Sequence, residues 1–299
     1  MNNFFTAINN IPIYGVGLGL RREFDKYLLD NDFSKLNPIN ILEIIPENYI
    51  NVGGKAQDRL YRASQIYQLT SHGVNLSIAS CDDLNINYLK SLKEFVIKYN
   101  IEWFSDHLCF TSIENKYMHE LMPFPFNEES LEHLIPRIVF VQNYVGKPFL
   151  VENISYYVQF DESCMTEPDF MTQLLEKADC GLLLDVNNIY VNSCNFKFDP
   201  YQFIDNMPLD RVVQIHIAGH SNNTDLVIDT HGNSIIDEVY SLLEYTLNKC
   251  QPKAITLERD QNYPPFDEII FELNKINTIF FKQTLYFFTN SILEKQSQT

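Results

Sequence analysis

Short apolar stretches of strand length alternate along the chain with longer stretches in which apolar residues return every three or four positions. This alternation is typical of a parallel α/β fold, in which each buried strand is followed by a helix that covers the sheet. The strand-length runs are Tyr14–Leu20, Ile39–Ile45, Val74–Ala79, Ile101–Ser105, Pro148–Val151, Gly181–Asp185, Val212–Ile217 and Ala254–Leu257. The expected helices include Ala56–Thr70, Leu84–Tyr99, Glu128–Tyr144, Glu167–Ala178, Ser234–Lys249 and Asp267–Lys275.

Eight strand–helix units predict an α/β fold of the (β/α)8 TIM-barrel type. We expect one barrel domain over residues 1–275 and a C-terminal helical extension over 276–299, which either closes the barrel or binds a partner, closure being the preferred interpretation. A chain of 299 residues suits one large domain. A doubly wound open sheet is the alternative, but Gly15, Gly17 and Gly19 lack the spacing of a dinucleotide-binding loop.

The charge balance disfavours a polyanionic partner. The chain has 22 Lys and Arg against 39 Asp and Glu, a formal net charge of −17, so we expect no nucleic-acid partner. Its six cysteines form no C-x-x-C pair, which is typical of reduced thiols. The first 20 residues lack a signal-peptide pattern, and no apolar run approaches the roughly 20 residues that span a bilayer. We therefore expect a cytoplasmic protein without a membrane segment.

Imidazoles, carboxylates and amides gather where the predicted strands end. In a barrel of this type the carboxyl ends of the strands and the loops after them build the active site. Five of the seven histidines fall at such positions, and only His119 and His133 lie elsewhere, as expected of surface or helix-face residues. The residues at these positions are His72, Asp106, His107, Glu152, Asn153, Asp185, Asn188, His216, His220, Asp229, His231 and the run Glu258–Asp260.

Several carboxylates directed at one barrel mouth predict bound cations. Without cations they would repel one another and raise each other's pKa values. Ligation by His, Asp, Glu and Asn without Cys suits Fe(II), Mn(II) or Zn(II), and the candidates exceed what one ion needs. The residue types therefore favour two or three clustered ions.

Each motif alone also has a structural interpretation. Asp229-x-His231 could be a turn with a capping Asp, Asp185 could close an Asx-turn, and Glu258 could form an ion pair at the rim. The metal prediction depends on their convergence on one face. Asp106 and His107 are adjacent and would face opposite ways on a straight strand, so we expect His107 to be the ligand and Asp106 to support it or act in catalysis.

Other polar and aromatic residues near the same face are candidates for substrate contact. Glu47 and Asn48, after the second predicted strand, could orient substrate or a metal-bound water, or could cap their loop. Asn153 is a further candidate for substrate binding, and Tyr156 and Tyr157 could line a peptide groove or pack against a helix. His220 is expected to orient a ligand or donate a proton.

Taken together, the ordered segments GVGLGLR, LEIIPENY, SHGVNLSIAS, SDHLCF, LMPFPF, LVENISYY, LLLDVNNIYVNS, IHIAGH, DTHG and ERD resemble one known family. It is the multinuclear non-heme iron-dependent oxidative enzyme family, typified by the methanobactin-biosynthesis oxygenase. The resemblance runs from about Gly15 to Asp260 and implies a xylose-isomerase-like barrel, which is also similar to the trinuclear zinc endonuclease barrel.

The resemblance implies a ligand set: His72, His107, Glu152, Asp185, Asn188, His216, Asp229, His231 and Glu258. Asn188 stands where the zinc nuclease pattern has His, which would leave one site looser and more open. Two departures affect the expected metal count. Many family members carry His where this chain has Ile45, and Glu-His where it has Asp106-His107.

The resemblance also implies a chemistry. Two or three irons per chain, at least one of them Fe(II), would use O2 to oxidise cysteine residues of a ribosomally made precursor peptide. A peptide-recognition partner protein is expected, as is usual in the family. Two other classes stay open: a divalent-metal hydrolase or isomerase on the same barrel, and a metal-loaded barrel that binds peptide without turnover.

Overall fold

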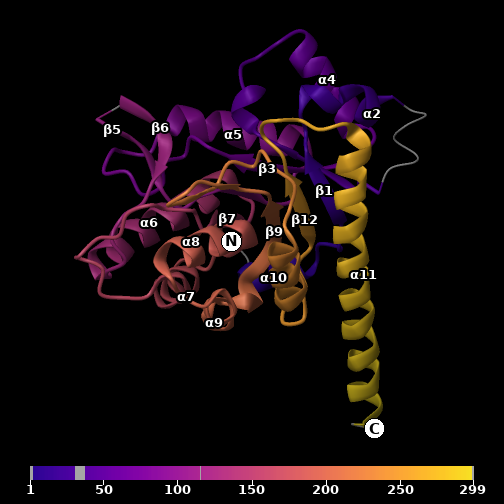
Figure 1. Cartoon of the computed structure of the whole chain (residues 1–299). Helices are drawn as coiled ribbons and strands as arrows, with labels where there is room; N and C mark the ends of the chain where they lie inside the picture. Colours follow the sequence, from indigo (N-terminus) through magenta and orange to yellow (C-terminus); the bar gives the residue numbers. More distant parts are fainter. Residues whose placement is uncertain (1–2, 31–37, 115, 298–299) are drawn as a thin grey trace.

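The computed structural model describes residues 3–30, 38–114 and 116–297. Over the described residues, eight parallel strands form a closed barrel, which confirms the predicted TIM barrel. Helices surround these strands (Figure 1). Around the barrel the strands follow the chain, and β1 pairs with both β2 and β12 to close it. The barrel strands are β1 (Gly15–Gly19), β2 (Ile41–Ile44), β3 (Gln68–Gly73), β4 (Phe104–His107), β7 (Phe149–Glu152), β8 (Gly181–Asp185), β9 (Val212–Ala218) and β12 (Ala254–Glu258).

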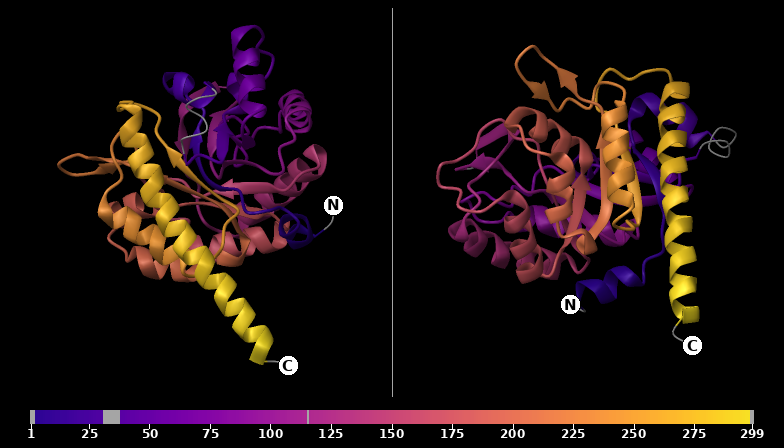
Figure 2. Two further views of the ribbon diagram at one scale, coloured as in Figure 1. Left: turned by 90° about the vertical axis from the view of Figure 1, so that its right-hand side faces the viewer. Right: turned by 60° about the horizontal axis from the view of Figure 1, so that its bottom comes forward.

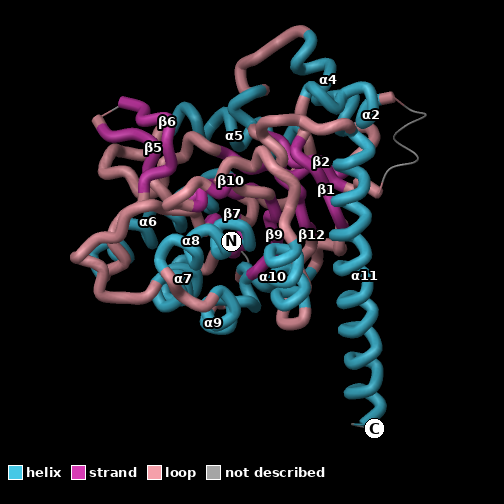
Figure 3. Tube along the Cα trace, viewed as in Figure 1, coloured by secondary structure: helices cyan, strands magenta, loops and turns pink. Residues whose placement is uncertain are grey.

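Helices cover the outside of this barrel, and two small antiparallel hairpins extend from its loops (Figure 3). The hairpins are β5 (Phe110–Ile113) with β6 (Lys116–Met122), and β10 (Ser221–Asn222) with β11 (Val227–Ile228). The helices are α1 (Phe4–Asn9), α2 (Asp25–Leu29), α4 (Lys55–Ser64), α5 (Ile86–Lys98), α6 (Glu128–Val145), α7 (Glu167–Ala178), α8 (Val186–Phe196), α9 (Pro200–Asn206), α10 (Asp237–Leu247) and α11 (Phe266–Ser297). Short 3-10 turns span Arg22–Phe24, Pro46–Asn48 and Leu209–Arg211.

The third strand lies earlier in the chain than its apolar pattern suggested. The prediction of a strand at Val74–Ala79 after a helix at Ala56–Thr70 was wrong, because α4 ends at Ser64 and β3 spans Gln68–Gly73. Alternating side chains of β3 point into the barrel, and these inward positions carry Thr70 and His72. Polar inward residues remove the apolar run by which a buried parallel strand is normally recognised.

The barrel interior is apolar at its amino-terminal end and becomes polar toward its carboxyl-terminal end. At the amino-terminal end, Phe4 and Ile8 of α1 pack with Trp103 and other apolar side chains in a separate core cluster. Above it, the Trp103 indole donates a hydrogen bond of 2.8 Å to Gln214 Oε1, and Gln214 in turn bonds Thr256 at 3.0 Å. This hydrogen-bonded polar layer supports the carboxyl-terminal end, where the candidate site lies.

The last helix, α11, runs without a break from Phe266 to Ser297. Ile269, Leu273, Ile276 and Phe280 are buried on its inner face, and Figure 2 shows its C-terminal half extending beyond the barrel. The predicted division at residue 275 falls inside this helix and stays a prediction, since the side chains beyond Leu285 lie outside the described residues. Over the described residues, no helix is both long enough and apolar enough to cross a bilayer.

A buried ion pair joins the end of β12 to α11. Arg259 Nη2 contacts Glu272 Oε2 at 3.0 Å, and both side chains are at most 8% exposed. Replacing Arg259 with methionine keeps the side-chain length but leaves the Glu272 carboxylate buried without a cation, so the free energy of unfolding should fall by about 3–5 kcal/mol. Lys282 and Glu244 form an exposed pair between α11 and α10. Lys282→Ala should therefore change the free energy of unfolding by only about 0–1 kcal/mol. Denaturant titrations of the two variants and the wild type would measure both changes. Equal losses would contradict this prediction.

Candidate metal centre

Among the described residues, three groups of ligand-type side chains meet at the carboxyl-terminal end of the barrel. Within each group, one ligand atom from every member lies within 4.8 Å of those of the others. The first group is His72, His107 and Glu152; the second is Glu152, Asp185, His216 and Glu258; the third is His231, Glu258 and Asp260. Glu152 belongs to the first and second groups and Glu258 to the second and third, so the three candidate sites form one connected row.

Register within the sheet produces this convergence. His107 is paired with Glu152 across β4 and β7, and Asp185 with His216 across β8 and β9. Paired residues on neighbouring parallel strands point to the same side of the sheet, here into the barrel. The strand ends identified in the sequence therefore bring their side chains together.

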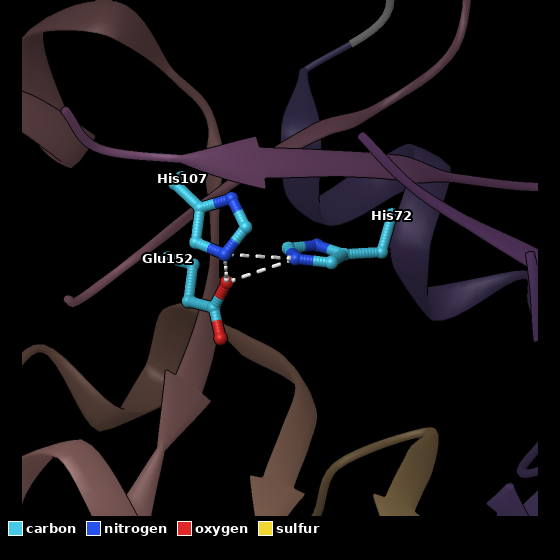
Figure 4. Close-up of side chains that lie close together, drawn as sticks. All are labelled: His72, His107 and Glu152. Atoms are coloured by element: carbon cyan, nitrogen blue, oxygen red, sulfur yellow. Dashed lines mark hydrogen bonds and ion pairs between the residues drawn. The ribbon is translucent and has the colours of Figure 1, made fainter. Parts of the chain in front are cut away.

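In the first group, three ligand atoms converge on one point (Figure 4). His72 Nε2 and His107 Nε2 lie 3.2 Å apart, and Glu152 Oε2 lies 3.1 Å from the first and 3.2 Å from the second. Bonds of about 2.0–2.2 Å from a metal to N or O ligands place neighbouring ligand atoms roughly 3–3.5 Å apart. The spacing therefore fits a single ion held by all three.

The His72 ring is oriented by a hydroxyl chain. Its Nδ1 lies 2.9 Å from Ser105 Oγ, and the Ser105 hydroxyl donates to the Ser71 carbonyl at 3.2 Å. Because that hydroxyl proton is already used, Ser105 accepts a hydrogen bond from His72 Nδ1–H. The Nε2 lone pair of His72 is then directed at the first group, which is the arrangement expected of a metal-binding histidine.

Replacing Ser105 with alanine should therefore weaken the first metal site and spare the others. The hydroxyl is lost, the His72 ring is no longer fixed, and removal of such an outer partner lowers metal affinity by about 10- to 100-fold. A competitive titration with a chelator should show one weakened site. Ser241, which lies on the exposed side of α10 and whose hydroxyl donates to the Asp237 carbonyl, gives a matched control as Ser241→Ala. Equal weakening of all sites would contradict a local effect.

In the second group, His216 lies between carboxylates on both sides. Its Nδ1 contacts Glu152 Oε1 at 3.0 Å and Glu258 Oε2 at 3.1 Å, while its Nε2 contacts Glu43 Oε1 at 2.9 Å. Nδ1 is therefore the candidate ligand atom, and Glu43 holds the other ring nitrogen in the way that carboxylates support metal-bound histidines.

Glu43 was missed by the sequence analysis. It lies inside the apolar strand β2, is 4% exposed, and also accepts a hydrogen bond from Gln214. A charged residue within an otherwise apolar strand is the signal that could have identified it, because such a residue is rarely buried unless paired.

In the third group, the ligand set differs in part from the expected one. His231 Nδ1 lies 3.5 Å from Glu258 Oε2 and 3.4 Å from Asp260 Oδ2, while its Nε2 lies 2.8 Å from Asp229 Oδ1. Asp229 therefore contacts the histidine on the side away from this group. Asp260 takes part instead and also pairs with Arg21; the sequence analysis noted it in the ERD segment but did not select it.

Unpaired buried oxygens support metal binding here. Asp185 Oδ2 and Asn188 Oδ1 are buried and accept no hydrogen bond. Asp185 Oδ1, in contrast, accepts from the Asn188 backbone at 2.6 Å, so its second oxygen is left free. Buried polar atoms without partners are rare in folded proteins and are explained when an ion fills the space. The donor set fits a metal cluster, and Asn188 can contribute its amide oxygen.

Without metal, the charges of these groups are balanced by protons. Burial lowers the pKa of His72, but the neighbouring carboxylates Glu152 and Glu43 together outweigh this effect and raise it to about 9. Burial also lowers the pKa of His107, in this case to about 4. Burial and the nearby Glu152 raise the pKa of Asp185 well above its usual value. Ions bound here would take over the neutralisation of these carboxylates.

Asp106 points away from the three groups. Its Oδ2 accepts from the backbone of Leu76 at 3.1 Å, and its Oδ1 accepts from the backbone of His107 at 2.8 Å. A Cβ at Gly73 would lie 2.6 Å from Asp106 Oδ2 and 3.3 Å from Glu47 Oε1, so the absence of a side chain at Gly73 makes room for both carboxylates. Burial and Glu47 raise the pKa of Asp106 to about 8.

Glu47 organises the loop that follows β3. Its Oε1 accepts from the backbone of Val74 and Asn75, each at 3.1 Å, and from the Tyr88 hydroxyl at 2.5 Å. Asn48 is exposed beside it. Glu47 thus contacts the backbone of the loop that follows His72 and the side chain of Tyr88.

Asn153 and His220 lie in hydrogen-bonded networks around the second and third groups. Asn153 exchanges two bonds with the backbone of Asp185, at 2.9 and 3.0 Å, so its amide fixes the end of β8. His220 Nδ1 lies 2.8 Å from Asn187 Oδ1, and Asn187 Nδ2 donates to Asp229 Oδ1 at 2.7 Å. The amide orientation makes His220 Nδ1 the donor and leaves His220 Nε2 buried without a hydrogen-bond partner.

Comparison with protein families identifies one match over nearly the whole chain. A family described as RiPP precursor modification enzyme MbnB/TglH/ChrH, where RiPP stands for ribosomally synthesised and post-translationally modified peptide, matches residues 15–280. A UPF0276 protein of Caulobacter vibrioides is 38% identical over 263 residues, which cover 88% of this chain and 93% of the relative. Another, from Acinetobacter baylyi, is 39% identical over 265 residues, covering 88% and 90%.

Solved structures share the fold at low identity. The 3-keto-D-glucoside 4-epimerase YcjR from E. coli superposes with a TM-score of 0.57 at 12% identity, covering 88% of this chain and 99% of the epimerase. A xylose isomerase domain protein from Planctomyces limnophilus gives 0.51 at 11% identity, covering 93% and 97%. These values confirm the xylose-isomerase-like barrel that the sequence motifs implied.

Proposed function

The chain belongs to the family of RiPP precursor modification enzymes, and from this membership we propose a specific activity for it. It is a multinuclear iron-dependent enzyme that uses O2 to oxidise cysteine residues of a ribosomally made precursor peptide. The observation that carries the proposal is the row of three ligand groups joined by Glu152 and Glu258 inside a barrel of this family. Such a row has room for two or three irons.

The donor set favours iron within this family. Imidazole and carboxylate ligands without cysteine suit Fe(II), and the neutral Asn188 amide is a weak ligand that leaves a position for substrate. Iron bound here would supply the redox chemistry and the affinity for a cysteine thiolate. The residues proposed to hold it are His72, His107, Glu152, Asp185, Asn188, His216, His231, Glu258 and Asp260, with Asp229 positioned against His231.

The chain's own groups would orient the ligands and move protons. His220 Nε2 carries a free lone pair, and burial lowers the pKa of this imidazole, so it is neutral and able to accept a proton from the substrate thiol. Asp106, Glu47 and Asn153 act on the site through backbone bonds that fix the strand and loop ends. Asn48 is retained as a candidate for peptide contact because it is exposed beside Glu47.

A partner protein is part of the proposal. The net charge of −17 would repel an acidic leader peptide, so a separate peptide-recognition protein is expected to deliver the substrate.

The direct test combines the iron-loaded protein, O2 and a cysteine-containing peptide encoded beside its gene, with and without a co-encoded partner. Mass spectrometry should show a mass change confined to cysteine-containing fragments, with O2 consumed in proportion. If no cysteine peptide is altered and bis(4-nitrophenyl) phosphate is hydrolysed by the zinc-loaded protein, the hydrolase alternative replaces the proposal.

A further inference from the structure

A pocket lies beside the candidate metal centre, and no step proposed above uses it. Its volume is about 520 Å³, within the range of roughly 300–1,000 Å³ typical of ligand sites. It is formed by the segment after β6, the long loop after β7, the first turn of α7 and the segment from the end of α8 into α9. The side chains that give it its character are Phe124, Phe126, Tyr156, Phe198, Phe203 and Glu167.

Aromatic rings make the walls of this pocket, which we call the aromatic pocket. Phe124 and Phe126 pack edge to face at 5.7 Å between ring centroids, and Phe198 and Phe203 stack at 5.1 Å. Tyr156 is held in place by its backbone bond of 3.0 Å to Asn192. Fixed rings whose faces carry partial negative charge attract cations.

The charged groups of the aromatic pocket are all acidic. Glu167 and Asp199 line it, and the described residues that line it include no lysine, arginine or histidine. Glu167 is 8% exposed, and its hydrogen-bonded partner is the Tyr156 hydroxyl at 3.1 Å. Burial raises the pKa of Glu167 to about 8, because the described part of the chain places no cation against it. A buried carboxyl of this kind is stabilised when a cation enters.

The aromatic pocket also reaches toward the metal centre. Phe124, Phe126, Tyr156 and Glu167 line a second, narrow cavity as well, whose other walls include Leu108 and Asn153. These two residues directly follow the ligands His107 and Glu152 in the chain. This cavity holds only about 10 Å³, so it is a packing gap and not a passage, but it shows that the aromatic pocket and the first ligand group have neighbouring walls.

From this geometry we infer that the aromatic pocket binds a basic side chain of the precursor peptide through the Glu167 carboxylate and the surrounding rings. Arginine fits better than lysine, because its planar guanidinium can stack on a ring while it donates to a carboxylate. The inference rests on the proposed function for the identity of the peptide, but the binding of the side chain itself does not depend on turnover.

Small amides test the inference in the metal-loaded full-length protein. Isothermal titration calorimetry would compare N-acetyl-arginine amide with N-acetyl-citrulline amide, its uncharged analogue of nearly the same shape. The arginine amide should bind the wild-type protein at least tenfold more tightly, and Glu167→Gln should abolish that preference. Glu128→Gln, an exposed carboxylate on α6, is the matched control and should leave it intact. Equal binding of both amides to the wild type would overturn the inference without reference to any variant.

A second measurement separates this inference from the proposed function. With a peptide that the wild-type enzyme modifies, Glu167→Gln should raise KM at least tenfold and leave kcat and iron content unchanged. An unchanged KM would overturn the pocket inference and leave the enzymatic activity standing. Preference for the arginine amide in a protein that alters no cysteine peptide would support the pocket and contradict the proposed function.

Discussion

Glu152→Gln should remove most of the bound metal and lower the rate of peptide oxidation by more than about 100-fold, since even groups outside the ligand shell change affinity or activity by about 10- to 100-fold. Glutamine keeps the shape of the side chain but loses its charge and one of its two acceptor oxygens. Those oxygens serve two ligand groups at once, Oε2 toward His72 and His107 and Oε1 toward His216. Elemental analysis and single-turnover assays would measure both effects.

Glu167→Gln is the matched control for metal content. Glu167 is also a buried carboxyl of the barrel mouth region, but it belongs to none of the three ligand groups formed by the described residues. The Glu167→Gln variant should therefore retain the iron content of the wild-type protein. If Glu152→Gln also retains full iron content, Glu152 does not join the first two sites.

Removing the metal should abolish activity, and only ferrous iron should restore it. Anaerobic treatment with a chelator would leave the buried carboxylates Asp185 and Glu258 without cations, and protons would have to take their place. The melting temperature should fall as well, because ions that bind only the folded state stabilise it by mass action. Calorimetry and O2-uptake measurements would follow both changes.

Reconstitution separates iron from other divalent ions. Fe(II) added to the stripped protein should restore O2 consumption with the peptide, while Zn(II) should restore the melting temperature alone. Activity restored by Zn(II) would place the protein with the metal-dependent hydrolases or isomerases instead.

Much of the barrel could be predicted from the sequence, because its signals are local. Gly181–Asp185 is an uninterrupted apolar run that ends in a carboxylate, and it forms β8 with the same bounds. Glu167–Ala178 forms α7 with the same bounds, helped by Thr166, which caps its first turn by accepting from the Asp169 backbone. β3 could not be recognised this way, because the inward positions of this strand carry polar residues of the site and of the layer below it.

The residues of the candidate site could be predicted where they end barrel strands. They could not be predicted where a residue lies deeper inside the barrel or where two loop residues compete for one position. His107, Glu152 and Asp185 end parallel strands, and the sheet register brings such ends together. Glu43 lies deeper in the barrel, and its approach to His216 follows from barrel closure, which no sequence window contains. The choice between Asp229 and Asp260 in the third group depends on which side of the His231 ring each one meets.

The central claim is that the connected ligand groups hold iron, and the most direct test is the metal content of the protein itself. The protein would be purified without oxygen from cells grown on iron-57 and measured by elemental analysis and Mössbauer spectroscopy. The three groups predict two or three irons per chain, at least one of them ferrous. Asp185→Ala or His216→Ala should remove this iron. Zinc alone, retained after aerobic supplementation with iron, would contradict the claim.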